Sequence, residues 1–136
     1  MAGVIPTRVH GILDYATAIV LIAAPWLFQF DDHRTAMLVP VVLGLGIILY
    51  SLLTDYEFGI AHLISMPTHL MLDVLGALVL IASPWIFGFS DDIWWPHIAI
   101  GLFELVVVVL SQSHRPDRLR GRTSMDGSGQ QRRMSS

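Results

Sequence analysis

The sequence predicts an all-α protein of four transmembrane helices, arranged as two tandem helical hairpins of the same orientation. Of the 136 residues, 54% are apolar and only 14% are charged, whereas soluble domains average about 25% charged residues. The apolar residues gather in four long windows, and the first half of the chain resembles the second. This composition argues against a soluble enzyme, a nucleic-acid-binding protein and a disordered chain.

Four windows are long and apolar enough to form membrane helices, because a helix needs about 20 mostly apolar residues to cross a bilayer. Three of them carry one acidic residue each, and the second carries no charge. That second window has no polar face to present to water, which argues against a soluble helical bundle. The windows comprise residues 9–28, 35–53, 70–89 and 93–110.

The placement of arginine predicts the orientation in the membrane. Four spans put both termini and the middle segment on one side. That side holds Arg8 and the six Arg of residues 112–136, whereas the other side holds only Arg34. Both termini should be cytoplasmic, since Lys and Arg are enriched on that side. All four Trp fall at the outer ends of spans, as in an interfacial aromatic belt: Trp26, Trp85, Trp94 and Trp95.

Two segments lie outside the predicted spans. Thr54 and Glu57 have the spacing of a helical capping box, so residues 54–69 form either a short interfacial helix or an irregular loop. Residues 112–136 are rich in Ser, Gly, Gln and Arg and lack apolar periodicity, so we expect a disordered cytoplasmic tail. The membrane domain is therefore expected to comprise residues 1–111.

An internal repeat is the strongest signal in the sequence. Residues 10–32 and 69–91 are identical at 13 of 23 aligned positions. Each half is therefore one hairpin, with the first repeat at about 6–54 and the second at about 67–111. Because two spans return the chain to its starting side, an axis along the membrane normal should relate the repeats. The matched pairs include His10/His69, Asp14/Asp73, Phe28/Phe87 and, in the second helices, Gly44/Gly101.

One motif carries a resemblance to a known family. The third window contains Ser83-Pro84-Trp85, the first contains the degenerate copy Ala24-Pro25-Trp26, and Thr54-Asp55-Tyr56-Glu57 separates the repeats. Over roughly residues 6–111 the chain resembles the SPW repeat family of bacterial integral membrane proteins. The resemblance implies a multi-pass protein of the bacterial inner membrane, and it implies no activity.

The Pro-Trp pairs have a physical interpretation of their own. Proline removes one backbone hydrogen-bond donor near the outer end of a span, and the following Trp then lies at headgroup depth. Ser83 is expected to donate to a carbonyl oxygen that Pro84 leaves free. A kink with a membrane anchor is one interpretation of the motif, and a ligand gate is the other.

Two His–Asp pairs form the first candidate site. His10 and Asp14 are four residues apart, as are His69 and Asp73, so each pair shares one face of its helix. That face continues in both helices as a stripe of small residues, which lets membrane helices approach closely. We therefore expect the first and third helices to pack on each other. Asp14 would then reach His69, and Asp73 would reach His10.

Three interpretations of these pairs stay open. A carboxylate at the centre of a span costs about 2.5–3.5 kcal/mol, so both acids should face the bundle interior and be paired or protonated. The pairs could form an interhelical hydrogen-bond lock. They could line a proton or cation path. They could also bind a metal ion through two imidazoles and two carboxylates, with His10, Asp14, His69 and Asp73 as candidate ligands.

Glu104 is the second candidate. It lies 11 residues after Ile93, or about 16 Å along a helix, which is near the middle of the membrane. Its repeat equivalent is the apolar Ile47. A lone acid at this depth is expensive and often functional. A protonated carboxyl group bonded to a backbone carbonyl or a Ser is the structural alternative.

The absence of cysteine and of known catalytic motifs limits the possible functions. The chain has no Cys, which excludes thiolate metal sites and Cys nucleophiles, and it carries no catalytic or nucleotide-binding motif. We expect a non-enzymatic membrane protein without a cofactor, in contact with lipid and not nucleic acid. It would act as a structural or interaction protein through self-association or a membrane-protein partner. The alternative is a proton- or cation-conducting module that uses Asp14, Asp73 and Glu104.

Overall fold

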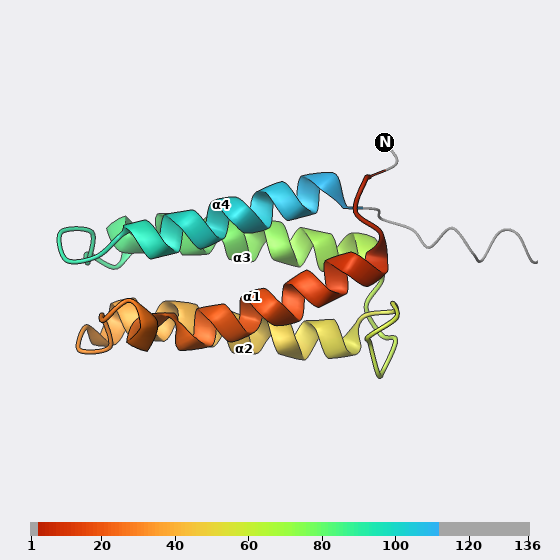
Figure 1. Cartoon of the computed structure of the whole chain (residues 1–136), viewed down its shortest axis with the longest axis horizontal. Coiled ribbons are helices and arrows are strands. Elements are labelled where there is room, and N and C mark those ends of the chain that lie inside the picture. The colour runs from red at the N-terminus through yellow and green to blue at the C-terminus, as the bar shows by residue number, and fades with distance from the viewer. Residues whose placement is uncertain (1–2, 112–136) are drawn as a thin grey trace, which may run out of the picture.

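The computed structural model describes residues 3–111 and is all-helical within them. These residues form four helices (Figure 1), which confirms the predicted all-α fold class. The predicted tail at residues 112–136 lies outside the described residues. The helices are α1 (Thr7–Leu27), α2 (Arg34–Leu53), α3 (Met66–Ile86) and α4 (Trp95–Leu110).

The four helices form a bundle of two side-by-side hairpins. α1 runs along α2, and α3 runs along α4. Between the hairpins, α2 packs against α3 and α1 against α4, so α1 and α3 lie on a diagonal of the bundle. The two short loops, 28–33 and 87–94, lie at one end, and the middle segment 54–65 lies at the other (Figure 1).

The expected packing of the first helix on the third is made through side chains: Leu21 of α1 and Leu80 of α3, both on the predicted face, belong to one buried cluster, although the closest backbone approaches of α1 and α3 are to other helices. The small residues serve contacts inside each hairpin, where a glycine of the second helix meets the backbone of the first. A Cβ at Gly44 would lie 2.8 Å from the carbonyl oxygen of Ala18, and one at Gly101 would lie 3.0 Å from that of Ala77. The stripe therefore brings α1 close to α2, and α3 close to α4.

The outer surface of the bundle is that of a membrane protein. α1, α2 and α3 are each long and apolar enough to cross a bilayer, with mean hydropathies of 1.4, 2.4 and 1.8 over 18 residues. α4 is apolar but shorter, at 16 residues, or about 24 Å. Its outward side chains are also apolar; Val109 is 79% exposed. A water-soluble monomer rarely exposes apolar patches of this extent.

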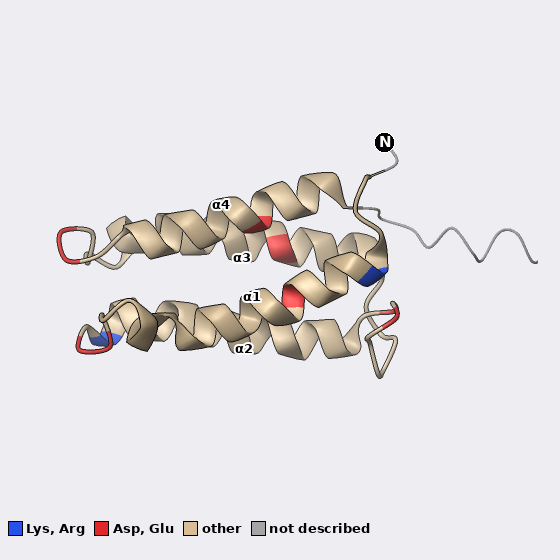
Figure 2. Ribbon diagram, in the orientation of Figure 1, with Lys and Arg blue, Asp and Glu red and all other residues tan. Residues whose placement is uncertain are grey.

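The positions of the charged residues also fit a membrane protein. Figure 2 shows them at the two ends of the bundle, apart from three acids within the helices. Those three face the interior and are at most 5% exposed: Asp14, Asp73 and Glu104.

The middle segment is an irregular loop, and no helix forms between α2 and α3. Its backbone folds back over the end of α2, where Ile60 donates to the Leu52 carbonyl at 2.7 Å and Leu63 donates to that of Leu53 at 2.7 Å. The last carbonyls of a helix have no partner within it, so the loop serves as the cap of α2. Tyr56 of this loop is fully buried, and burial raises its pKa.

Candidate functional site

Four buried side chains from α1 and α3 meet in the half of the bundle next to the middle segment. We refer to His10, Asp14, His69 and Asp73 as the quartet. His69 Nε2 lies 2.7 Å from Asp14 Oδ2, and His10 Nε2 lies 3.1 Å from Asp73 Oδ2. All four residues are at most 4% exposed. These crossed contacts match the geometry expected from the sequence.

Each imidazole also faces the carboxylate of its own helix. His10 Nε2 lies 3.1 Å from Asp14 Oδ1, and His69 Nε2 lies 3.4 Å from Asp73 Oδ2. The two rings meet edge to face, with their centroids 5.4 Å apart. Both Nε2 atoms therefore point at the same pair of carboxylates.

The other ring nitrogens are held by two hydroxyl groups that terminate the second helices. His10 Nδ1 lies 2.7 Å from Ser111 Oγ, and His69 Nδ1 lies 2.7 Å from Thr54 Oγ1. Thr54 and Ser111 are 57 residues apart, the same offset as Gly44 and Gly101. Each repeat thus supplies the hydroxyl that holds the histidine of the other repeat.

The hydroxyl protons already have acceptors. Ser111 donates to the Val107 carbonyl at 2.5 Å, and Thr54 donates to the Tyr50 carbonyl at 2.6 Å. A hydroxyl group has one proton, so both hydroxyl oxygens accept from the imidazoles. Each histidine therefore carries a proton on Nδ1.

Tyr50 breaks the symmetry of the quartet. Its hydroxyl donates to Asp73 Oδ1 at 2.5 Å, and its ring packs edge-on against His69 at 5.0 Å. The residue 57 positions later is Val107, which has no hydroxyl to offer Asp14. Asp73 consequently has one more hydrogen-bond donor than its counterpart.

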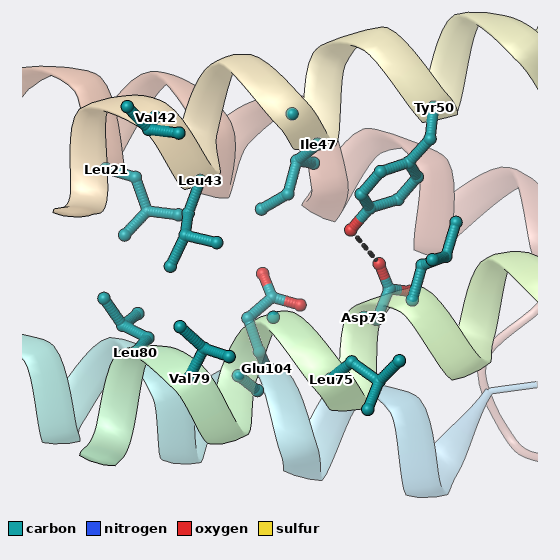
Figure 3. A pocket seen from close by; sticks show the side chains of 14 residues that line it. Leu21, Val42, Leu43, Ile47, Tyr50, Asp73, Leu75, Val79, Leu80 and Glu104 are labelled. Carbon is teal, nitrogen blue, oxygen red and sulfur yellow. Dashed lines mark hydrogen bonds between the residues drawn. The ribbon is translucent and has the colours of Figure 1, made fainter. Parts of the chain in front are cut away.

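Glu104 lies in the same interior. Figure 3 shows its carboxyl group pointing into a cavity of about 360 Å³ that Asp73 and Tyr50 also line. Thr17 of α1 lies near this carboxyl group. The other lining side chains are almost all aliphatic, among them Leu21, Val42, Leu43, Ile47, Leu75, Val79 and Leu80.

The repeated motif lies at the opposite end of the bundle. Pro25 and Pro84 are buried in the last turns of α1 and α3, whereas Trp26 and Trp85 are 57% and 58% exposed. Ser83 Oγ donates to the Leu80 carbonyl at 2.7 Å. That carbonyl is the one that Pro84, lacking an N–H, cannot reach.

The hydrogen bond from Ser83 to the Leu80 carbonyl confirms that Ser83 donates to the carbonyl that Pro84 leaves free. Ala24 occupies the equivalent place in α1 and has no hydroxyl to donate.

The family is now identifiable. The family model of the SPW repeat domain matches residues 8–111. The chain belongs to the SPW repeat family. No curated protein and no solved structure matches it. The matched range contains the quartet, Thr54, Ser111 and both Pro-Trp pairs, so in this chain each repeat is a helical hairpin with a His–Asp pair toward one end and a Pro-Trp pair toward the other.

The site of this SPW repeat protein has a definite chemical capacity. It concentrates two imidazoles, two carboxylates and a phenol in a space closed to solvent, with the histidine tautomers set by hydroxyl groups. In such surroundings hydrogen bonds and charge pairs are strong, because little water competes for the donors and acceptors. The arrangement can lock helices, exchange protons among its members or hold a cation.

Sequence reasoning identified the quartet but missed three of its partners. Tyr50, Thr54 and Ser111 each lie on the second helix of a hairpin or just after it, and nothing in their spacing marks them as neighbours of a histidine. The repeat did contain a signal. Thr54 and Ser111 share the offset of the glycine pair, so hydroxyl residues at equivalent positions pointed to a common role.

Proposed function

We propose that this SPW repeat protein is a non-enzymatic structural or interaction protein, in which the quartet locks its two hairpins together. The observation that carries the proposal is the crossed pairing of Asp14 with His69 and of Asp73 with His10. These contacts join the two helices that lie diagonally in the bundle. They therefore tie one repeat to the other across the diagonal of the bundle.

The interior beyond the quartet supports a lock more than a path. Toward the outer end, the next buried layer is the apolar cluster of Ala18, Leu21, Ile47 and Leu80. The buried polar groups on its far side, Ser83 and His97, bond to backbone carbonyls. A proton relay needs neighbouring polar groups, and between Glu104 and these two residues the buried clusters are made of apolar side chains.

The proposed setting is the bacterial inner membrane, with four spans and both termini cytoplasmic. The distribution of Arg supports that orientation. The four Trp support it as well, since all lie at the end of the bundle opposite the middle segment and are about half exposed. The apolar outer faces of α2 and α4 would contact lipid, a second copy of the chain or a membrane-protein partner.

One experiment separates the lock from conduction. Wild type and the Asp14→Asn/Asp73→Asn double variant are purified, and their resistance to unfolding is measured in detergent. Both are then placed in liposomes, and pH-driven ion flux is recorded. A lock predicts a less stable variant and no flux above empty liposomes for either protein. Flux in wild type that is lost in a folded variant would contradict the proposal.

Conduction of protons or cations is the second candidate, and one observation favours it. Glu104 and Asp73 line the same cavity, with Tyr50 beside them, so three ionisable groups share the membrane interior. The matched test is Glu104→Gln, which keeps size and removes the charge. If the protein conducts, this variant should fold normally and lose at least tenfold of the wild-type flux.

A further inference from the structure

The protons on the two histidines of the quartet bear on a role other than locking the hairpins. Both histidines carry a proton on Nδ1, because the hydroxyls of Ser111 and Thr54 already donate their hydrogen bonds to backbone carbonyls and can only accept from the imidazoles. A neutral imidazole has only one N–H, so in the neutral form of the two histidines each Nε2 presents a lone pair. Both lone pairs point at carboxylate oxygens, which present lone pairs of their own.

This arrangement needs positive charge at its centre. The two carboxylates bring two negative charges, and the described residues supply no Lys or Arg to balance them. The ion pairs of both acids are with histidines alone, and Arg8 is exposed. Either two further protons or one divalent cation would satisfy all four groups.

We infer that the quartet is a binding site for one divalent transition-metal cation, held by both Nε2 atoms and one oxygen from each aspartate. One potential ligand atom from each residue lies within 4.8 Å of all the others, and all four residues are buried. Ligand atoms around a tetrahedral zinc ion lie about 3.4 Å apart. The Nε2–oxygen separations run from 2.7 to 3.4 Å, with Asp73 Oδ2 facing both histidines, Asp14 Oδ1 facing His10 and Asp14 Oδ2 facing His69.

The second layer of contacts is that of a metal site. Metal-binding histidines usually donate their other N–H to a fixed acceptor, which sets the ring orientation. Ser111 and Thr54 are those acceptors. Tyr50 holds Asp73 Oδ1 and leaves Oδ2 facing the imidazoles. Two imidazoles and two carboxylates suit zinc and its first-row neighbours better than magnesium or calcium.

The inference goes beyond the proposed lock and does not depend on it. The hydrogen-bonded quartet would join the hairpins without a metal, and the cation would replace its protons. Failure of one proposal therefore leaves the other standing. Stability of the metal-free Asp variants tests the lock, and metal content tests the site.

The test uses the full chain without a histidine tag, stripped with a chelator in detergent. Zinc is added, the excess is removed, and bound zinc is measured by mass spectrometry. We expect one zinc ion per chain in wild type, and at least a tenfold loss of affinity in His10→Ala and His69→Ala. His62→Ala is the matched control, because His62 also pairs with an aspartate, at 3.0 Å, on the exposed surface.

Two further measurements guard against misfolded variants. Thr54→Val and Ser111→Ala leave all four ligands in place and should weaken zinc binding about 10–100-fold. X-ray absorption of zinc-loaded wild type should show a nitrogen and oxygen shell with imidazole scattering. Less than half a zinc ion per chain in wild type, or zinc that His62→Ala removes and His10→Ala does not, would overturn the inference.

Discussion

The two repeats share the residues that hold the bundle together and differ in the residues around its interior space. Each contributes a histidine, an aspartate, a glycine against the facing helix, a terminal hydroxyl and a Pro-Trp pair. Several equivalent positions have diverged in character inside the bundle, among them Ala24/Ser83, Ile47/Glu104 and Tyr50/Val107.

This divergence makes the two sides of the bundle unlike. Between α2 and α3 the cavity is lined by Asp73, Glu104 and Tyr50 among aliphatic residues. Between α1 and α4 a groove of similar size, about 370 Å³, has Thr17 as its polar side chain. Duplication alone would give two matching sides. Conduction, the second candidate function, should therefore depend on the α2–α3 side.

Removing either aspartate should produce the largest effect on the free energy of unfolding. Asp14→Ala leaves His69 without its closest carboxylate, and breaking a buried charge pair in this way costs about 3–5 kcal/mol. Asp73→Ala should cost more than Asp14→Ala, because Tyr50 also loses its acceptor. Unfolding of both variants in a denaturing detergent series measures the difference. Equal losses would show that the asymmetry at Tyr50 carries no energy.

Tyr50→Phe isolates that asymmetry. The variant keeps the ring against His69 and removes only the hydroxyl that donates to Asp73. A hydrogen bond to a charged group contributes about 1.5–3 kcal/mol, so a loss in that range is expected in the same unfolding assay. Tyr15→Phe is the matched control, because the Tyr15 hydroxyl donates to the Phe58 carbonyl at 3.2 Å on the surface. Its loss should stay below about 0.5 kcal/mol.

The glycine pair tests whether the shared features are equivalent. Gly44→Ala and Gly101→Ala should each cost about 1–3 kcal/mol, the usual penalty of overpacking. Gly44→Ala should cost more, since its new Cβ would lie nearer to a backbone carbonyl, whereas the nearest atom to Gly101 is the flexible Ile81 side chain at 2.6 Å.

Gly46 and Gly76 supply the control for this pair, because a Cβ at either meets no atom within 4 Å. Alanine at those positions should be neutral or stabilise the helix by up to about 1 kcal/mol. Losses at all four glycines would mean that helix flexibility, and not close packing, explains the effect. Thermal unfolding of the four variants distinguishes these outcomes.

The sequence predicts the elements well because the membrane imposes a simple rule of length and polarity. The four apolar windows became four helices, and duplication of a His–Asp pair at helical spacing predicted the crossed contacts. The neighbours of the small-residue stripe could not be predicted. A face of small residues shows that something approaches closely, and only the crossing of the helices shows that Gly44 and Gly101 do so.

The capping-box spacing in the middle segment misleads for a related reason. Thr54 has the right distance to Glu57, but its hydroxyl is already engaged by the Tyr50 carbonyl and by His69. The contact of Thr54 with the distant His69 takes the place of a local cap with Glu57. The contacts of Tyr50 with Asp73 and of Ser111 with His10 could not be predicted for a similar reason, since they depend on how α2 and α4 are rotated about their axes.

The smallest expected effect lies at the end of the bundle opposite the middle segment, where Ser83 and Ala24 differ. Ser83→Ala removes the donor to the Leu80 carbonyl, and hydrogen bonds of this kind inside membranes average about 0.6 kcal/mol. Ala24→Ser should restore the missing contact in α1 and stabilise it by a similar amount. Swapping both residues should therefore leave the unfolding midpoint unchanged. A net loss in the swapped protein would mean that Ser83 has a role that α1 cannot supply, and would favour a ligand gate over a kink with an anchor.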